Sequence, residues 1–163
     1  MIKGLHHIAF RCRDSEETRA FYEEVLGLEL VKALPIERTV TGRTTHALHT
    51  FYAMGDGSAV AFFEEPAQPF AFKDQRDFDL HLALEATPDA IARARSAALA
   101  RGLEVRGPTD HGFVRSTYFR DPNGYVVELC ERQPRRSEAG TGAKSEAHAV
   151  LARWRDSVAA PGA

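Results

Sequence analysis

Hydrophobic and polar residues alternate with a period of two in several short stretches, and each stretch ends in turn-forming residues. This pattern predicts strands, because side chains alternate between the two faces of a sheet. The predicted strands cover residues 5–12, 28–33, 44–54, 59–64, 79–85, 103–106 and 125–130, with one more leading into the turn at 121–124. That turn reads Asp-Pro-Asn-Gly, in which each residue type suits its position. We therefore expect a β-hairpin around it.

Apolar residues at helical spacing predict a helix after Asp14 and another after Thr87. Asp14 is followed three residues later by Glu17, as in a capping box, and Thr87 precedes a proline at the first helical position. Gly27 and Gly102 follow the two apolar stripes and suit the residue that closes a helix.

The order strand, helix, three strands occurs twice, at a shift of about 74 residues. The segment His-Ile-Ala-Phe at 7–10 matches His-Leu-Ala-Leu at 81–84 in pattern. We therefore predict an α+β fold of two βαβββ modules, about 3–65 and 78–132, which form one domain over residues 1–132.

The composition changes after this domain. Residues 133–144 are polar and include proline and two glycines, which is typical of a linker. Residues 145–158 carry Ala147, Leu151, Trp154 and Val158 at helical spacing. This pattern predicts a terminal amphipathic helix that packs on the domain or on a partner subunit.

Net charge and cysteine content narrow the possible functions. The formal charge is −2, with 44% hydrophobic and 27% charged residues, so no basic surface for nucleic acid or membrane is expected. No apolar run has the length of a membrane span or of a signal peptide. Two cysteines, Cys12 and Cys130, are too few for a disulfide framework. We expect a cytoplasmic protein.

Glu128 is the most unusual polar residue, because it lies in the middle of an apolar strand with no lysine or arginine within three residues. A buried carboxylate needs a cationic partner. His7 and His81 occupy equivalent positions in the two modules, beside the small residues Ala9 and Ala83. Each histidine alone is more commonly an ordinary strand residue. Together with a carboxylate, two imidazoles form the ligand set that holds a divalent metal and leaves positions open for substrate or dioxygen.

The chain resembles the vicinal oxygen chelate superfamily, which includes glyoxalase I, extradiol dioxygenases, fosfomycin resistance proteins and bleomycin-binding proteins. The resemblance covers residues 3–132 and is strongest in GLHHIAFRC, AFYEEVLGLEL, DLHLALE and YFRDPNGYVVEL. It implies that the modules form a cupped mixed sheet around a metal. The implied ligands are His7, His81 and Glu128, with His6 as a second choice for the first position.

The resemblance differs in strength between the members of the superfamily. The fourth ligand of glyoxalase I falls on Phe62 or its neighbour, which cannot bind a metal. A threonine that the fosfomycin enzymes place two residues after their first ligand is Ala9, and their hairpin lysine has no counterpart.

The extradiol dioxygenases match better around the last hairpin. Their tyrosine corresponds to Tyr118, and a loop histidine resembles His111. Their distal histidine falls on Ser58, and His49 on the preceding strand is a possible substitute or an ordinary strand residue.

These features predict an Fe(II) or Mn(II) enzyme for a small substrate with two adjacent oxygens, with an extradiol ring-cleaving dioxygenase of a catechol-like compound as the favoured case. In that reaction Tyr118 would hydrogen-bond a substrate oxygen and His111 would transfer protons. The alternatives are a glyoxalase-like lyase, an isomerase or epimerase, a thiol transferase, or a non-catalytic drug-binding protein. Five phenylalanines could line an apolar pocket for an aromatic ring or simply pack in the core, namely Phe62, Phe63, Phe70, Phe72 and Phe113. We expect a homodimer, in which the modules pair within one chain or between two.

Overall fold

The structure is a computed structural model that describes residues 1–133 and 143–159. Its first module forms a four-stranded sheet, sheet A, with the strand order β1-β4-β3-β2. The elements of this module are β1 (His7–Arg11), α1 (Ser15–Arg19), η1 (Ala20–Val25), β2 (Leu30–Arg38), β3 (Thr44–Ala53) and β4 (Ala59–Glu64). Strand β1 is parallel to β4, and the other neighbours are antiparallel.

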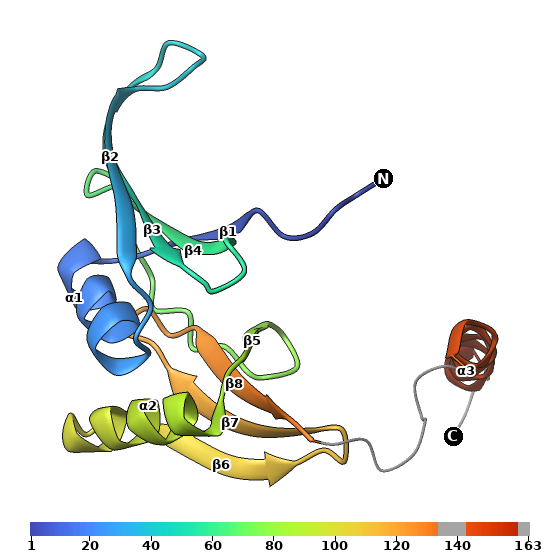
Figure 1. Cartoon of the computed structure of the whole chain (residues 1–163). Coiled ribbons are helices and arrows are strands. Elements are labelled where there is room, and N and C mark those ends of the chain that lie inside the picture. The colour runs from blue at the N-terminus through green and yellow to red at the C-terminus, as the bar shows by residue number, and fades with distance from the viewer. Residues whose placement is uncertain (134–142, 160–163) are drawn as a thin grey trace.

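The second module repeats this arrangement in sheet B, with the order β5-β8-β7-β6. Its elements are β5 (His81–Glu85), α2 (Pro88–Ala100), β6 (Val105–Asp110), β7 (Val114–Arg120) and β8 (Val126–Arg132). The parallel pair is again the first and last strand of the module. The predicted α+β fold of two βαβββ modules is confirmed, with the sheets as two separate four-stranded units. In Figure 1 the two modules lie one above the other, with α1 and α2 on the same side.

The first helical segment differs from the single α-helix that its periodicity predicts. Asp14 caps it as expected, because its carboxylate accepts from the backbone N–H groups of Glu16 and Glu17. From Ala20 onward the turns widen to π-helical geometry, in which the Leu26 N–H donates to the Phe21 carbonyl at 3.1 Å. The apolar spacing predicts the helix but does not distinguish these two windings.

One hydrophobic core joins the two modules. Phe10 of β1 packs on Tyr125 with ring centroids 4.8 Å apart, and Tyr22 of η1 packs on Phe62 at the same separation. Phe119 and the other alternate residues of sheet B belong to the same cluster. Because side chains alternate along a strand, the faces that carry His7 and His81 lie opposite this core. We call them the open faces of sheets A and B.

The Asp-Pro-Asn-Gly turn connects the hairpin of sheet B to the helical segment of the first module. Within the turn, the Asp121 carboxylate accepts from the N–H groups of Asn123 and Tyr125 at 2.9 and 2.8 Å. Across the modules, the Tyr22 hydroxyl donates to Asp121 at 3.2 Å and the Asn123 amide donates to the Thr18 hydroxyl at 3.2 Å. The turn therefore shapes the hairpin and also fixes the two modules to each other.

The predicted strand bounds are correct to within a few residues, except in two strands. Strand β2 runs to Arg38, past the predicted end at residue 33, and β6 runs to Asp110, past the predicted end at Arg106. The pairing of β6 with β7 shifts register between Arg106 and Thr109, so a bulge carries the strand past a Gly-Pro pair that reads as a strand end.

The terminal helix α3 spans Ala143–Ala159, close to its predicted range. Its apolar stripe is not covered: Leu151 and Trp154 are 63% and 64% exposed. Among the described residues, no helix is long and apolar enough to span a membrane.

Candidate metal centre

His81 and Glu128 face each other on the open face of sheet B. Strands β5 and β8 are parallel neighbours, and the Nε2 atom of His81 lies 3.1 Å from an Oε2 atom of Glu128. Glu128 is only 6% exposed, whereas His81 is exposed. The structure therefore brings together two of the three residues that the sequence predicts as metal ligands.

The second ring nitrogen of His81 is also engaged. Its Nδ1 lies 2.7 Å from the backbone carbonyl oxygen of Asp77, in the connection that precedes β5. A carbonyl only accepts hydrogen bonds, so Nδ1 carries the proton and the Nε2 atom of a neutral ring presents a lone pair. That lone pair faces a carboxylate oxygen, and two acceptors at this distance require a proton or a cation between them. The donor set is thus suited to a metal ion.

Tyr118 and His111 lie beside this pair. Tyr118 is directly opposite Glu128 in the pairing of β7 with β8. Its hydroxyl is 3.0 Å from the Nε2 atom of His111, in the loop before β7. Burial, followed by the negative charge of Glu128, raises the pKa of Tyr118, so the phenol stays protonated and can donate.

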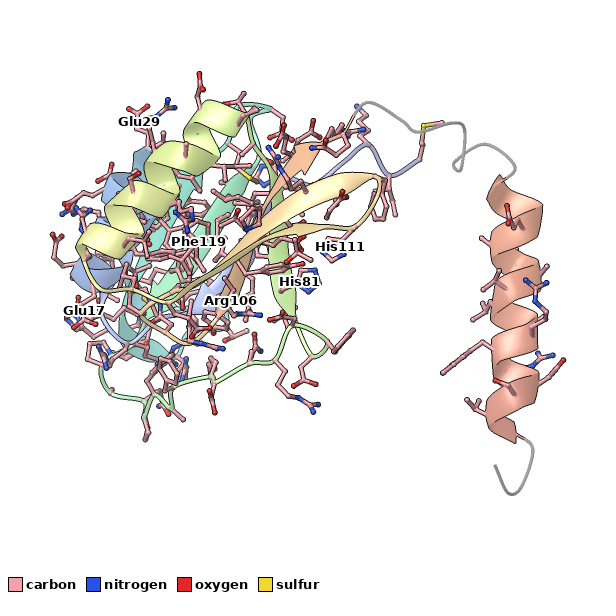
Figure 2. All side chains as sticks on the ribbon, turned by 90° about the horizontal axis from the view of Figure 1, so that it is seen from below. Glu17, Glu29, His81, Arg106, His111 and Phe119 are labelled. Atoms are coloured by element: carbon pink, nitrogen blue, oxygen red, sulfur yellow. The ribbon has the colours of Figure 1, made fainter. Side chains whose placement is uncertain are left out.

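Arg106 completes this group and was not predicted from the sequence. Its guanidinium lies 5.2 Å from the centroid of the Tyr118 ring and makes two hydrogen bonds to the Asp77 carboxylate, at 2.7 and 2.9 Å. Figure 2 shows His81, Arg106 and His111 on the side of sheet B away from α2. Asp77 thus contacts two groups of the site, His81 through its carbonyl and Arg106 through its carboxylate. In the sequence, the one indication that Asp77 belongs to the site is its position four residues before the candidate ligand His81.

His7 is not brought to the other two residues within one chain. It begins β1, next to Ala59 of β4, and its Nδ1 lies 2.7 Å from the Nδ1 of His6. In the part of the chain that the structure describes, no three or more histidine, cysteine, aspartate or glutamate side chains are grouped in a way that could hold a metal ion. His7 instead lies on the open face of sheet A, away from His81 and Glu128.

His49 lies on that same open face, on β3. Its ring centroid is 6.3 Å from that of His7 and 4.1 Å from that of Phe51, and it stacks on Phe63 at 3.6 Å. The distal position of the extradiol enzymes, Ser58, is instead buried in a turn, where its hydroxyl and N–H donate to Asp56. His49 is the only one of these two positions that lies beside His7.

Comparison of the two sheets identifies the equivalent positions of the modules. His7 pairs with Ala59 as His81 pairs with Val126, so Ala61 is the counterpart of Glu128. The sequence placed the fourth ligand of glyoxalase I at Phe62 or its neighbour. The strand register shows that the position equivalent to Glu128 is the neighbour, Ala61. Alanine provides no ligand there, as expected.

The phenylalanines predicted to line one pocket lie in different places. Phe62 is fully buried in the core, so core packing is the alternative that applies to it, and it lines no pocket. Phe63 lies on the open face of sheet A beside His49. Phe113 and Phe72 are 71% and 52% exposed.

Cys130 shares the open face of sheet B with Glu128, as strand alternation predicts. Ser116, directly opposite it on β7, lies with its hydroxyl 3.8 Å from the Cys130 sulfur. Burial, followed by a hydrogen bond to Glu128, raises the pKa of Cys130 to about 11. The thiol is therefore protonated at neutral pH and is a neighbour of the site with little nucleophilic character.

Known proteins are similar to this chain in sequence and in structure. The family model described as the Glyoxalase/Bleomycin resistance protein/Dioxygenase superfamily matches residues 4–129. The uncharacterized protein YwkD of Bacillus subtilis (strain 168) is 26% identical over 135 residues, which are 81% of this chain and 99% of that protein.

Two solved structures of fosfomycin resistance proteins are also similar. The FosX protein of Mesorhizobium loti has a TM-score of 0.58 and 25% identity, and the match covers 91% of this chain and 99% of that one. A FosX variant from Listeria monocytogenes, in complex with Mn(II) and 1S,2S-dihydroxypropylphosphonic acid, has a TM-score of 0.59 and 20% identity over 82% of this chain and 95% of that one. On the match over residues 4–129, the chain belongs to the glyoxalase/bleomycin resistance protein/dioxygenase superfamily.

Proposed function

We propose that this protein is a divalent-metal-dependent enzyme acting on a small substrate with two adjacent oxygens. The proposed ligands are His81 and Glu128 of one chain and His7 of a second copy. A bound ion would supply Lewis-acid activation of the two substrate oxygens. The observation that carries the proposal is the Nε2 atom of His81 3.1 Å from the Glu128 carboxylate, while Nδ1 of the same ring lies against the Asp77 carbonyl.

His7 of the second copy is proposed because the two open faces have complementary contents. The open face of sheet A carries one candidate ligand, and that of sheet B carries two. Both sheets turn their other face to the shared core, so a second molecule is the simplest source of the missing imidazole. The bound form of one superfamily member, FosX with Mn(II) and a vicinal diol, supports both the metal and the substrate class.

Metal binding tests this proposal directly. Metal-free protein is titrated with Mn(II), and we expect His7→Ala, His81→Ala and Glu128→Gln each to abolish tight binding while the fold survives. His111→Ala is the matched control, because His111 lies close to the site but bonds to Tyr118 and is not a proposed ligand. Stoichiometric Mn(II) retained in all three ligand variants would falsify the assignment.

The favoured reaction is extradiol cleavage of a catechol-like compound, with dioxygen as co-substrate. Tyr118 supports it, since a protonated phenol beside Glu128 is placed to donate to a substrate oxygen. His111, bonded to that phenol, is placed to pass a proton between the site and solvent. The open positions of a three-ligand metal site suit a two-oxygen substrate and dioxygen.

Oxygen uptake by the Fe(II)-loaded protein with a series of catechols tests this reaction. We expect Tyr118→Phe to lower kcat by a factor equivalent to about 2–4 kcal/mol, because a hydrogen bond to developing charge is lost. Mn(II) affinity should stay unchanged, which separates the hydroxyl from the ligands. A fully active Tyr118→Phe variant would make this tyrosine a packing residue.

A second candidate is the metal-assisted addition of water or a thiol to a small oxygenated substrate. It is favoured by the absence of a histidine at Ser58, which lies in a turn, and by the 25% identity to a FosX protein. Turnover of such a substrate by Mn(II)-loaded protein, without oxygen uptake on any catechol, would select it over the dioxygenase.

A further inference from the structure

His49 is held by one hydrogen bond and by two aromatic rings. Its Nδ1 lies 2.9 Å from the backbone carbonyl of Phe62, and its ring stacks on Phe63 with an interplanar angle of 12°. Phe51 packs against it with a centroid distance of 4.1 Å. Rotation of the imidazole would lose the hydrogen bond and the stacking together.

These contacts determine which nitrogen carries the proton. The Phe62 carbonyl can only accept, so the Nδ1 of His49 is the donor. Nε2 of the neutral ring is then an acceptor with an available lone pair. The tautomer thus follows from the backbone and not from any group in the site.

Nε2 has no hydrogen-bond partner among the described residues, although His49 is only 8% exposed. It is not among the enclosed polar atoms that lack a partner in this part of the chain, so it is accessible from outside. This accessible acceptor lies beside aromatic rings and is open to a donor. A donor from a bound molecule would satisfy it.

We propose that His49 is a substrate-contacting residue whose Nε2 accepts a hydrogen bond from a hydroxyl of the bound substrate. The substrate class is a small hydroxylated molecule with a flat apolar part that lies against Phe51, whose ring centroid is 5.6 Å from that of His7. This inference rests on the proposed function, because it places the substrate between His7 and the partner's open face of sheet B. Module 1 then contributes recognition as well as one ligand.

Binding of 4-nitrocatechol to the Mn(II)-loaded protein, followed by its visible absorbance, tests the assignment. His49→Phe removes the acceptor and keeps an aromatic ring for the stack on Phe63. We expect its Kd for 4-nitrocatechol to rise roughly three- to tenfold, the loss of one hydrogen bond. His49→Gln, which can present a carbonyl oxygen, should retain more of the affinity and serves if the first variant does not fold.

The matched control is His46→Phe, the same substitution on the same strand at an exposed position. It should leave the Kd for 4-nitrocatechol unchanged. Mn(II) affinity should be the same in wild type and in all His49 and His46 variants.

Several results would overturn the inference. Equal Kd values in wild type and in the folded His49 variants would do so, as would a Mn(II)-loaded wild type that binds no 4-nitrocatechol. Loss of Mn(II) in His49→Phe would make His49 a ligand instead. Failure of the proposed function gives a different result, because wild-type protein would then bind no Mn(II).

Discussion

At the scale of single residues, Asp77 has two separable roles in the site. Its backbone carbonyl fixes the Nδ1 proton of His81, and its carboxylate holds Arg106 over the Tyr118 ring. A side-chain substitution at Asp77 changes the second contact and leaves the first. A substitution at Asp77 can therefore test the surroundings of the Tyr118 phenol without changing the contact that orients His81.

Asp77→Asn should lower the free energy of unfolding at neutral pH by less than about 1 kcal/mol, because both partners of the ion pair are partly exposed. The hydrogen bond from Arg106 lowers the pKa of Asp77. A lowered folded-state pKa stabilises the fold above the ordinary carboxyl range, and this contribution is lost as the pH falls through the folded-state value. The difference between wild type and variant should therefore vanish in acid.

Urea unfolding at neutral and acidic pH measures this effect, and a Mn(II) titration at neutral pH should show unchanged affinity. Asp79→Asn is the control, since Asp79 forms a similar pair with the exposed Arg76. A large loss of Mn(II) affinity in Asp77→Asn alone would show that the carboxylate also orients the site.

At the scale of elements, the turn before β8 has the largest structural role. Its side chains bond within the turn and to the helical segment of the other module, so the hairpin that carries Glu128 is positioned by contacts from both modules. Asn123 also accepts from the Arg13 N–H at 2.8 Å. Loss of these hydrogen bonds is expected to weaken the contact between the two modules.

Asn123→Ala should lower the free energy of unfolding by about 1–3 kcal/mol, because it leaves buried hydrogen-bonding groups without partners. Thermal or urea unfolding of the purified variant measures this. Asp110→Ala, which removes an exposed side chain that accepts from the Gly112 N–H in another turn, is the control. Equal losses in the two variants would show that Asn123 acts only within its own turn.

The elements show what the sequence could predict. Strict alternation and two nearly equal module lengths predict the repeat, because both depend on neighbours along the chain. Strand β6 was predicted too short because the bulge after Arg106 depends on its partner strand. The pair His81 and Glu128 was expected from the isolated carboxylate and from the resemblance to the superfamily, and the parallel pairing of β5 with β8 brings the two side chains together. Whether His7 would join them from the same chain or from a second copy is not predictable from the sequence, because a connection of this length permits both arrangements.

At the scale of the whole molecule, the separation of His7 from the other two candidate ligands would make the proposed metal site a property of a dimer. His7→Ala and Glu128→Gln each damage every site of their own homodimers. In a mixed dimer, one site combines both substitutions and the other combines neither. The mixture should therefore regain metal binding that both parents lack.

We expect an unfolded and refolded equimolar mixture of His7→Ala and Glu128→Gln to bind Mn(II) at about a quarter of the wild-type sites, since half of randomly formed dimers are mixed and each has one intact site. Sedimentation should show a dimer for all samples. A mixture of His81→Ala and Glu128→Gln is the control and should regain nothing. Recovery in neither mixture would place all three ligands in one chain or remove His7 from the site.

The alanine at position 61 also determines the electrostatic balance of the proposed site. With Ala61 in place of a second carboxylate, a divalent ion and Glu128 leave one positive charge uncompensated. Electroneutrality in a half-buried site then favours a ligand that binds as a monoanion, such as a singly deprotonated diol, over a neutral one. Ala61→Glu would remove this preference by adding the missing negative charge.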